Sequence, residues 1–171
     1  ELQIGLALSD KWREAHACIN LGAVCRQMRH FDEAMTYILS AQKAFQAIHA
    51  PLVKHAFVTL ELGLLAKDQG QWSVAEEYLS YSVSLWREVG DPVYLANCLK
   101  LLGQVLEAQD KTDAALDVYH EALDQLAQTE NQLDKTRVLN ELGTLHLKLA
   151  NLAEAQHLFL EAYASCSRQS G

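Results

Sequence analysis

Residues 99–126 read LKLLGQVLEAQDKTDAALDVYHEALDQL, and this stretch decides the fold. Gly103 is followed by Ala115 and Tyr119, with a polar turn at Asp110 between them. The apolar positions on both sides of that turn recur at three and four residues, which is the spacing of one helix face. The stretch therefore predicts two amphipathic helices that form an antiparallel hairpin.

The same pattern occurs four times along the chain. The Leu-Gly pairs are spaced by 41, 40 and 40 residues, at Leu21-Gly22, Leu62-Gly63, Leu102-Gly103 and Leu142-Gly143. An alanine stands twelve residues after each glycine, at Ala34, Ala75, Ala115 and Ala155. A large apolar residue follows four positions later, at Ile38, Leu79, Tyr119 and Phe159. Self-similarity at a fixed period predicts a repeat protein in which every unit has a first helix, A, and a second helix, B.

The predicted A helices span residues 11–28, 52–69, 92–109 and 132–149, and the predicted B helices span 31–48, 72–89, 112–128 and 152–168. The repeats then occupy residues 10–49, 50–90, 91–130 and 131–171. Residues 1–9 align with residues 82–90, which predicts that they are the tail of a preceding B helix. Asp91-Pro92 is the clearest start signal, because Asp is a good N-cap and Pro fits the first helical position. Weaker capping signals stand at Ser9-Asp10, Ala50-Pro51 and Glu130-Asn131.

The glycine of each repeat requires a physical reason. Glycine inside a helix costs about 1 kcal/mol relative to alanine. A glycine at the point where two helices cross allows their backbones to approach. We therefore predict that each glycine and the alanine twelve residues later form the close contact of the hairpin.

Composition excludes several function classes. The 171 residues carry a net charge of -8, and Lys and Arg are scattered instead of forming a stripe that could neutralise phosphates. Nucleic acid is therefore not an expected partner. No apolar run reaches the roughly 18 residues of a membrane span, and no secretion signal opens the sequence.

The cysteines predict reduced, buried thiols. Cys18 and Cys25 fall in one predicted helix, about 10 Å apart at 1.5 Å rise per residue, which is too far for a disulfide. Reduced thiols indicate a cytoplasmic protein. Metal binding by Cys18, Cys25 and His30 is the weaker alternative, because both cysteines occupy core positions.

No motif for catalysis is present. The seven histidines do not pair at metal-ligand spacing beside a carboxylate. A Gly-rich phosphate loop, a serine elbow and an H-E-x-x-H motif are also missing from the sequence. We therefore expect neither an enzyme nor a cofactor nor a metal site.

The pattern Leu-Gly, Ala, large apolar residue and second Ala resembles the tetratricopeptide repeat, and the resemblance covers nearly the whole chain. It departs from the usual repeat in two ways: the proline after helix B is absent, and the aromatic residue three positions after the glycine is replaced. Together with the 40-residue period, this resembles the long-helix subgroup of bacterial signal-transduction (STAND-type) ATPases, transcription activators and eukaryotic polarity adaptors. The resemblance implies an all-α fold, a right-handed α-α superhelical solenoid of four helix-turn-helix repeats plus the end of a preceding helix.

In this family the A helices line a concave surface that binds a protein or peptide. Carried over position by position, the resemblance assigns partner binding to His16, Asn20, Arg26, Phe57, Leu60, Glu61, Leu64, Asn97, Lys100, Gln104, Arg137, Asn140 and Glu141. The first of two predicted patches is apolar, formed by Phe57, Leu60, Leu64 and Leu101. The second is polar, formed by Asn97, Lys100, Gln104, Arg137 and Asn140. Amide side chains can form hydrogen bonds with an extended peptide backbone, and the cations can bind a carboxylate. For any single charged residue the alternative is that its side chain is simply a solvated surface group.

The resemblance implies a protein-binding module, the sensor or autoinhibitory segment of a larger bacterial signalling ATPase or regulator. The partner would be a peptide, another protein or another domain of the same protein. A static assembly scaffold or a co-chaperone-like adaptor is the alternative. We also expect the terminal repeat to expose apolar residues such as Leu158 or Tyr163, so that the uncapped ends self-associate.

Overall fold

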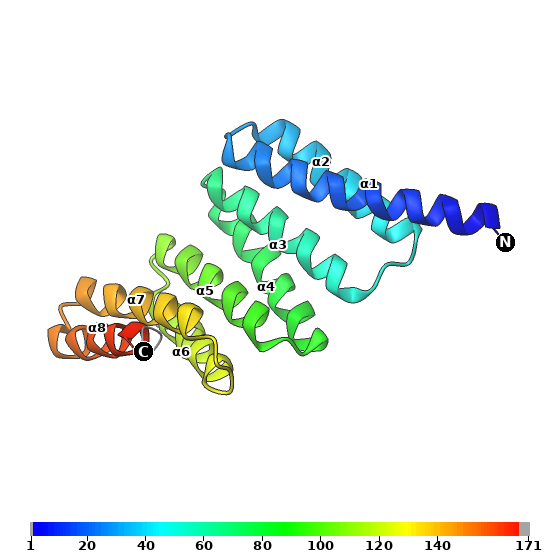
Figure 1. Ribbon diagram of the computed structural model, residues 1–171. Helices are drawn as coiled ribbons and strands as arrows, with labels where there is room; N and C mark the ends of the chain where they lie inside the picture. The colour runs from blue at the N-terminus through cyan, green and yellow to red at the C-terminus, as the bar shows by residue number, and fades with distance from the viewer. Residues whose placement is uncertain (1, 168–171) are drawn as a thin grey trace. The chain divides into compact units, whose positions relative to one another are not determined.

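The computed structural model describes residues 2–167, with the side chains of residues 10–165, and every regular element in that range is an α-helix (Figure 1). The helices are α1 (Leu2–Gln27), α2 (Phe31–Ala47), α3 (Leu52–Asp68), α4 (Trp72–Val89), α5 (Pro92–Ala108), α6 (Thr112–Ala127), α7 (Gln132–Lys148) and α8 (Leu152–Ser167). The bounds of α2 to α8 agree with the predicted ones to within one residue. The all-helical prediction is therefore confirmed.

The start of the first helix was predicted wrongly. We expected a helix beginning near residue 11, after a capping signal at Ser9-Asp10, but α1 runs without a break from Leu2 to Gln27. Neither Ser9 nor Asp10 breaks a helix, and no proline or φ > 0 residue interrupts this stretch of the backbone. The assignment of residues 1–9 to a preceding repeat stays a prediction.

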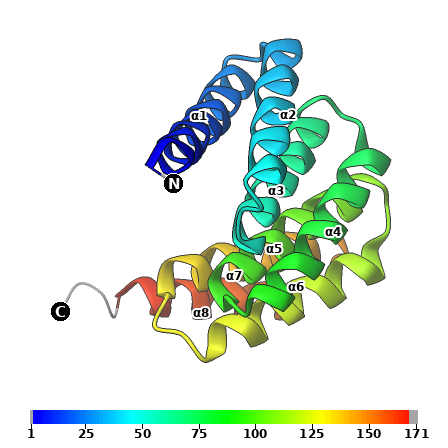
Figure 2. The ribbon, with the colours of Figure 1, turned by 90° about the vertical axis from the view of Figure 1, so that its right-hand side faces the viewer.

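The chain divides into two compact units, one up to Val89 and one from Gly90 onward. The first unit contains the hairpins α1/α2 and α3/α4, and the second contains α5/α6 and α7/α8. The partners of each hairpin lie side by side in both ribbon views (Figures 1 and 2). Inside each unit the second helix of one hairpin also packs on the first helix of the next, α2 on α3 and α6 on α7. All three tryptophans belong to the first unit.

The turn between helices A and B has the same geometry in every repeat. The seventh residue after each Leu-Gly glycine has a positive φ: 62° at Arg29, 73° at Gly70, 58° at Asp110 and 59° at Ala150. In the third repeat the amide of Asp110 donates to the carbonyl of Glu107, and that of Lys111 donates to the carbonyl of Leu106. This pair of bonds is the Schellman motif, which satisfies the last carbonyls of helix A. The four turns predicted from the sequence are confirmed.

Capping side chains begin two of the A helices. The Asp91 carboxylate accepts hydrogen bonds from the amides of Val93 and Tyr94, at 3.0 and 3.1 Å, ahead of Pro92 at the first helical position. The Asn131 side chain accepts from the amide of Asp134 at 3.1 Å. The start signals at Asp91-Pro92 and Glu130-Asn131 are therefore confirmed, while Ala50-Pro51 precedes α3 without a side-chain cap.

The glycines lie in the close contact of each hairpin, but mainly against a different residue from the one predicted. A Cβ atom at Gly103 would lie 2.5 Å from the ring of Tyr119, and at Gly63 one would lie 2.8 Å from the Leu79 side chain. The facing residue is thus the large apolar one sixteen positions on. The alanine twelve positions on is buried in each hairpin, and among the three atoms nearest to each such Cβ it contributes one at Gly22, the Ala34 carbonyl oxygen at 3.4 Å. The glycine provides space for a bulky side chain of helix B, and the backbone approach is secondary.

The core of the first unit continues from one hairpin into the next. Ile38, Ala41 and Phe45 of α2 belong to the same buried cluster as Leu62 and Leu65 of α3. The residues one before and two after the glycine of an A helix therefore pack toward the preceding B helix. This is the contact by which one repeat adds to another.

Candidate functional site

The predicted site residues of the first unit lie on α1 and α3, and several of them hold the unit together. The His16 ring has Nδ1 2.8 Å from the carbonyl oxygen of Trp12 and meets the Phe45 ring edge-on, with centroids 5.3 Å apart. Asn20 is exposed. His16 therefore belongs partly to the packing of the α1/α2 hairpin.

Arg26 links the two A helices of this unit. Its Nε donates to Glu61 at 3.3 Å and its Nη1 donates to Asp68 at 2.6 Å. Burial raises the pKa of the Glu61 carboxyl, and the Asp68 charge adds to that effect, while the Arg26 guanidinium opposes it. The resemblance assigned Arg26 and Glu61 to a partner surface, and in the structure they form an ion pair with each other; their role in partner binding stays a prediction. Asp68 was missed, because pairing across helices depends on how the repeats pack.

The apolar residues of α3 are largely covered. Leu60 is buried, Leu64 is half-buried, and the half-buried Phe57 ring packs edge-on against Trp86 at 4.9 Å between centroids. Lys54 Nζ lies 5.9 Å from the centroid of the Phe57 ring. Phe57 and Leu64 keep part of their surface accessible, while Leu60 offers little to a partner. The predicted apolar patch that joins these residues to Leu101 stays a prediction.

The second unit carries the polar set on α5 and α7. Asn97, Lys100 and Gln104 are half-buried and follow one another at three and four residues along α5, so they share one face. On α7, Arg137 and Asn140 are exposed and Glu141 is half-buried. The side-chain amide of Gln104 donates to Glu141, which joins the two helices. Arg137 forms an ion pair of 2.9 Å with Asp134, one turn earlier in its own helix.

A second link between α5 and α7 involves residues outside the predicted set. Glu107 accepts from the Tyr119 hydroxyl at 2.6 Å and pairs with Lys148 at 2.9 Å. Burial, followed by the hydrogen bond to Glu107, raises the pKa of Tyr119. Tyr119 therefore stays neutral and donates its hydroxyl proton to Glu107. Through its contacts with Tyr119 and Lys148, Glu107 of α5 links α5 to both α6 and α7.

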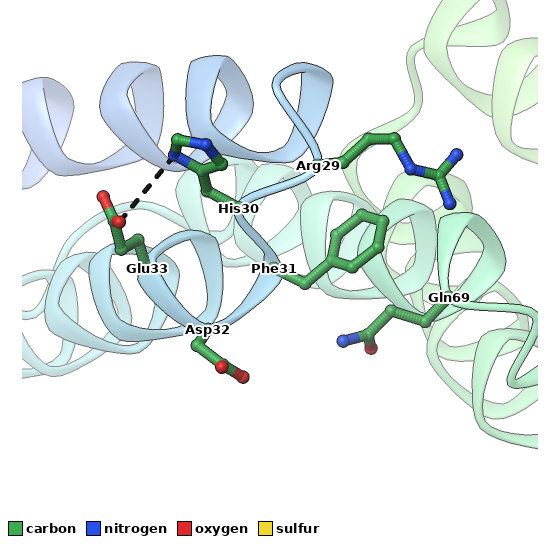
Figure 3. Close-up of a pocket in the computed structure, with 6 residues that line it drawn as sticks. All are labelled: Arg29, His30, Phe31, Asp32, Glu33 and Gln69. Atoms are coloured by element: carbon green, nitrogen blue, oxygen red, sulfur yellow. Dashed lines mark ion pairs between the residues drawn. The ribbon is translucent and has the colours of Figure 1, made fainter.

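A surface cavity of about 340 Å³ lies where the turn between α1 and α2 meets the end of α3, and the sequence did not predict it. Its lining is Arg29, His30, Phe31, Asp32, Glu33 and Gln69 (Figure 3). The guanidinium of Arg29 stands 5.4 Å from the centroid of the Phe31 ring, and His30 lies 3.7 Å from Glu33. Turn residues follow no helical period, so periodicity gave no signal for this cavity.

The described side chains form no cluster of three or more His, Cys, Asp or Glu that could hold a metal ion. Cys25 and Cys98 are buried, and burial followed by the Glu14 charge raises the pKa of the Cys18 thiol. In the described range, no helix has the length and apolar content needed to cross a bilayer.

Family comparison agrees with this architecture. Residues 15–47 and 55–128 match two family models, both described as tetratricopeptide repeat. This chain contains tetratricopeptide repeats. The matches include the first hairpin and most of the next two. Comparison with curated proteins finds no match.

Solved structures share the fold at low sequence identity. Aspartyl phosphate phosphatase F from Bacillus subtilis superposes with a TM-score of 0.87 at 13% identity, over 92% of this chain and 41% of that one. BtubC from P. vanneervenii gives 0.78 at 17% identity, over 94% of this chain and 72% of that one. The Rap conjugation gene regulator of plasmid pLS20, in complex with the Phr* peptide, gives 0.75 at 18% identity, over 91% and 43%. The chain thus spans less than half the length of the phosphatase and of the plasmid regulator.

Proposed function

We propose that this chain is a protein-binding or peptide-binding module whose binding surface is the A-helix face of each unit. The observation that carries the proposal is the polar stripe of the second unit, formed by Asn97, Lys100, Gln104, Arg137 and Asn140. None of these five residues is among the buried residues of α5 and α7.

The chemistry of the stripe suits an extended peptide. Asn97 and Asn140 provide amide donors and acceptors for a peptide backbone, and Lys100 and Arg137 provide cations for a carboxylate or an acidic side chain. The hydrogen bond from Gln104 to Glu141 keeps α5 and α7 in register, which fixes the spacing of the groups on either side of it. A preorganised surface loses less entropy when it binds.

In the first unit the same face is partly apolar. Phe57 and Leu64 retain accessible surface, and the Arg26–Glu61 pair lies on the same helices. A ligand with an apolar anchor as well as a charged group would find both kinds of contact on this chain. A fold relative is solved with a peptide, which supports a peptide as the ligand class.

We further propose that the module is the sensor or autoinhibitory segment of a larger bacterial signalling ATPase or regulator, on the basis of the resemblance of its 40-residue repeats to the long-helix subgroup. The ligand would then be an inducer, a partner protein or another domain of the same chain. Its binding would shift an equilibrium between two states by its difference in affinity for them.

The test uses a short peptide selected from a random displayed library against the immobilised chain. We expect the double variant Lys100→Glu/Arg137→Glu to bind that peptide at least about tenfold more weakly, a loss of about 1.4 kcal/mol. The matched control is Lys11→Glu/Lys43→Glu, which makes the same change of charge at two exposed positions on α1 and α2.

Equal weakening in both double variants would indicate a general charge effect and refute the assigned surface. Unchanged binding in Lys100→Glu/Arg137→Glu would refute it directly. In the full-length protein, the regulatory part of the proposal predicts a changed basal activity for the same variant. An unchanged basal activity would leave only the binding module.

A further inference from the structure

The ammonium group of Lys54 lies between two aromatic rings of the first unit. Its Nζ is 5.4 Å from the ring centroid of Trp12 on α1 and 5.9 Å from that of Phe57, one turn further along its own helix α3. Trp12 is 36% exposed, and Lys54 and Phe57 are half-buried. The cation and both rings therefore keep accessible surface. We call these three residues the Lys54 site.

Lys54 has no acidic partner in the part of the chain whose side chains the structure describes. Within that part its side chain forms neither an ion pair nor a hydrogen bond, and its contacts are those with the two rings. An aromatic ring attracts a cation through its quadrupole but carries no charge that could neutralise it. The charge and the N–H donors of Lys54 are therefore available to an anion.

The acids of α1 nearest to this site face other directions. Asp10 forms an ion pair of 3.8 Å with Arg13. Burial, followed by the charge of Glu14, raises the pKa of the Cys18 thiol, so Glu14 lies on the Cys18 side of the helix. Asp10 and Glu14 are each two residues from Trp12, and residues two apart do not share a helix face. Neither carboxylate therefore occupies the surface beside the indole ring.

The charge balance is different about four turns further along α1 and α3. There Arg26 is shared by two carboxylates, Glu61 at 3.3 Å and Asp68 at 2.6 Å. That end of the two helices is acidic, whereas the end at Lys54 has a cation without a carboxylate. An anionic ligand group is therefore favoured at Lys54 and disfavoured at Arg26.

The rings beside Lys54 are held in place by buried neighbours. The indole of Trp12 lies 4.9 Å from the His16 ring and 5.8 Å from the Phe45 ring, between centroids. Phe57 packs edge-on against Trp86. Phe45 and Trp86 are both buried, so the two rings of the Lys54 site are anchored to the core of their hairpins. A surface that is ordered before binding loses less entropy when a ligand arrives.

Exposed aromatic residues occur elsewhere in the described range, and exposure alone does not make a binding site. Tyr163 of α8 is 75% exposed, which confirms the expectation from the sequence. The same expectation for Leu158 is wrong, because Leu158 is buried. Self-association through the ends stays a prediction. Trp12 differs from Tyr163 by the cation that the structure holds against its ring.

We propose that the Lys54 site binds a carboxylate group of a peptide ligand together with an aromatic ring close to that carboxylate. The ammonium of Lys54 binds the carboxylate, and the ligand ring packs on the accessible part of Trp12. The flanking rings exclude water from part of the ammonium, so this ion pair is stronger than one at an open surface lysine. The proposal rests on the peptide-binding function proposed above, and it names the kind of ligand residue that the first unit takes.

Both an acidic side chain and a peptide C-terminus carry the required carboxylate, and small probes distinguish them. The N-acetylated, amidated dipeptides Phe-Glu and Phe-Gln differ in a side-chain carboxylate, whereas N-acetylphenylalanine and its amide differ in an α-carboxylate. Binding to the full chain is followed by the NMR signal of the Trp12 indole N–H, assigned with Trp12→Phe. We expect one carboxylate probe to bind at least about fivefold more tightly than its amide partner, which is the upper limit for an exposed ion pair.

The variant Lys54→Met keeps the apolar stem of the side chain and removes the charge, so it should abolish the preference for the carboxylate probe. Lys54→Arg should retain the preference, because the charge is kept. The matched control is Lys43→Met, which removes a charge from an exposed lysine of α2 and should also retain it. Circular dichroism of each variant checks that the helices are intact.

Equal affinity of the wild-type chain for carboxylate and amide in both pairs of probes would overturn the proposal. A preference that survives in Lys54→Met, or one that is lost equally in Lys43→Met, would overturn it as well. The peptide selected from the displayed library separates this outcome from a failure of the proposed function. If that peptide still depends on Lys100 and Arg137 while the probes show no preference, the peptide-binding function stands and the Lys54 site does not.

Discussion

Gly103→Ala is the most direct test of the packing described above. The added Cβ would lie 2.5 Å from Cε1 and 2.6 Å from Cζ of Tyr119, whereas ordinary contacts between carbon atoms are about 3.5–4.0 Å. The ring would have to move by about 1 Å. It is fully buried, and its hydroxyl is held by Glu107 at 2.6 Å. A movement of this size therefore disturbs both the packing and the hydrogen bond.

The opposing effects can be compared in magnitude. Overpacking of a core costs about 1–3 kcal/mol, and weakening the hydrogen bond to a carboxylate adds about 1 kcal/mol. Alanine recovers about 1 kcal/mol of helix propensity relative to glycine. We expect Gly103→Ala to lower the free energy of unfolding by about 1–3 kcal/mol in total, although alanine is the better helix former.

The assay is urea unfolding followed by circular dichroism, combined with amide hydrogen exchange to assign the loss to α5 and α6. The control is a double-mutant cycle with Tyr119→Ala. Without the ring, Gly103→Ala should be neutral or stabilising by up to about 1 kcal/mol. If Gly103→Ala costs the same in both backgrounds, the ring is not the reason for the glycine. If Tyr119→Ala is too unstable to measure, the cycle of Gly22→Ala with Ile38→Ala tests the same contact, since a Cβ at Gly22 would lie 2.7 Å from Ile38.

Three further variants test other contacts. Ala150→Gly should raise the free energy of unfolding by about 0.5–1 kcal/mol in urea titrations, because glycine tolerates the φ of 59° without strain; a loss of stability would refute the strain. Tyr119→Phe keeps the ring but removes the bond to Glu107, and should cost about 1–2 kcal/mol by the same titration, so an unchanged midpoint would mean that the bond contributes nothing. Arg26→Met leaves the Glu61 carboxylate without its cation and raises its pKa further. An acid whose pKa is raised in the folded state binds its proton more tightly in the folded than in the unfolded chain. At pH 7 the free energy of unfolding of Arg26→Met should therefore be lower than that of the wild type by about 2 kcal/mol. This difference should become smaller as the pH falls toward about 4, because Glu61 is then protonated. Repeating the comparison in a Glu61→Gln background should remove the part of the pH dependence that comes from Glu61, while the Arg26–Asp68 pair is lost in both backgrounds.

The sequence predicted the helices well because their signals are local. The glycine register, the turns after each A helix and the caps at Asp91 and Asn131 all depend on residues close to one another in the chain. The predicted start of the first helix was wrong because it also relied on a local signal. Ser9-Asp10 resembles an N-cap, but neither residue interrupts a helix. We predicted that each glycine contacts the alanine twelve positions later. In the structure the nearest side chain is the large apolar one sixteen positions later, on helix B.

The candidate site was less predictable, because it depends on how separate helices pack. Periodicity placed Arg26, Glu61, Gln104 and Glu141 on the A helices, but not their pairing across helices. The roles of Asp68, Glu107 and Lys148 required three-dimensional contacts. The partner-binding role of the predicted residues stays a prediction for the charge-reversal experiment.

The position of the three tryptophans has a practical consequence. Trp12, Trp72 and Trp86 all precede Gly90, so indole fluorescence reports on the first unit, while circular dichroism averages over every helix. Superimposable denaturation curves from the two signals would mean that the halves unfold together. If the two denaturation curves have different midpoints, each half unfolds in its own transition. The difference between the midpoints would then measure how strongly neighbouring repeats unfold cooperatively.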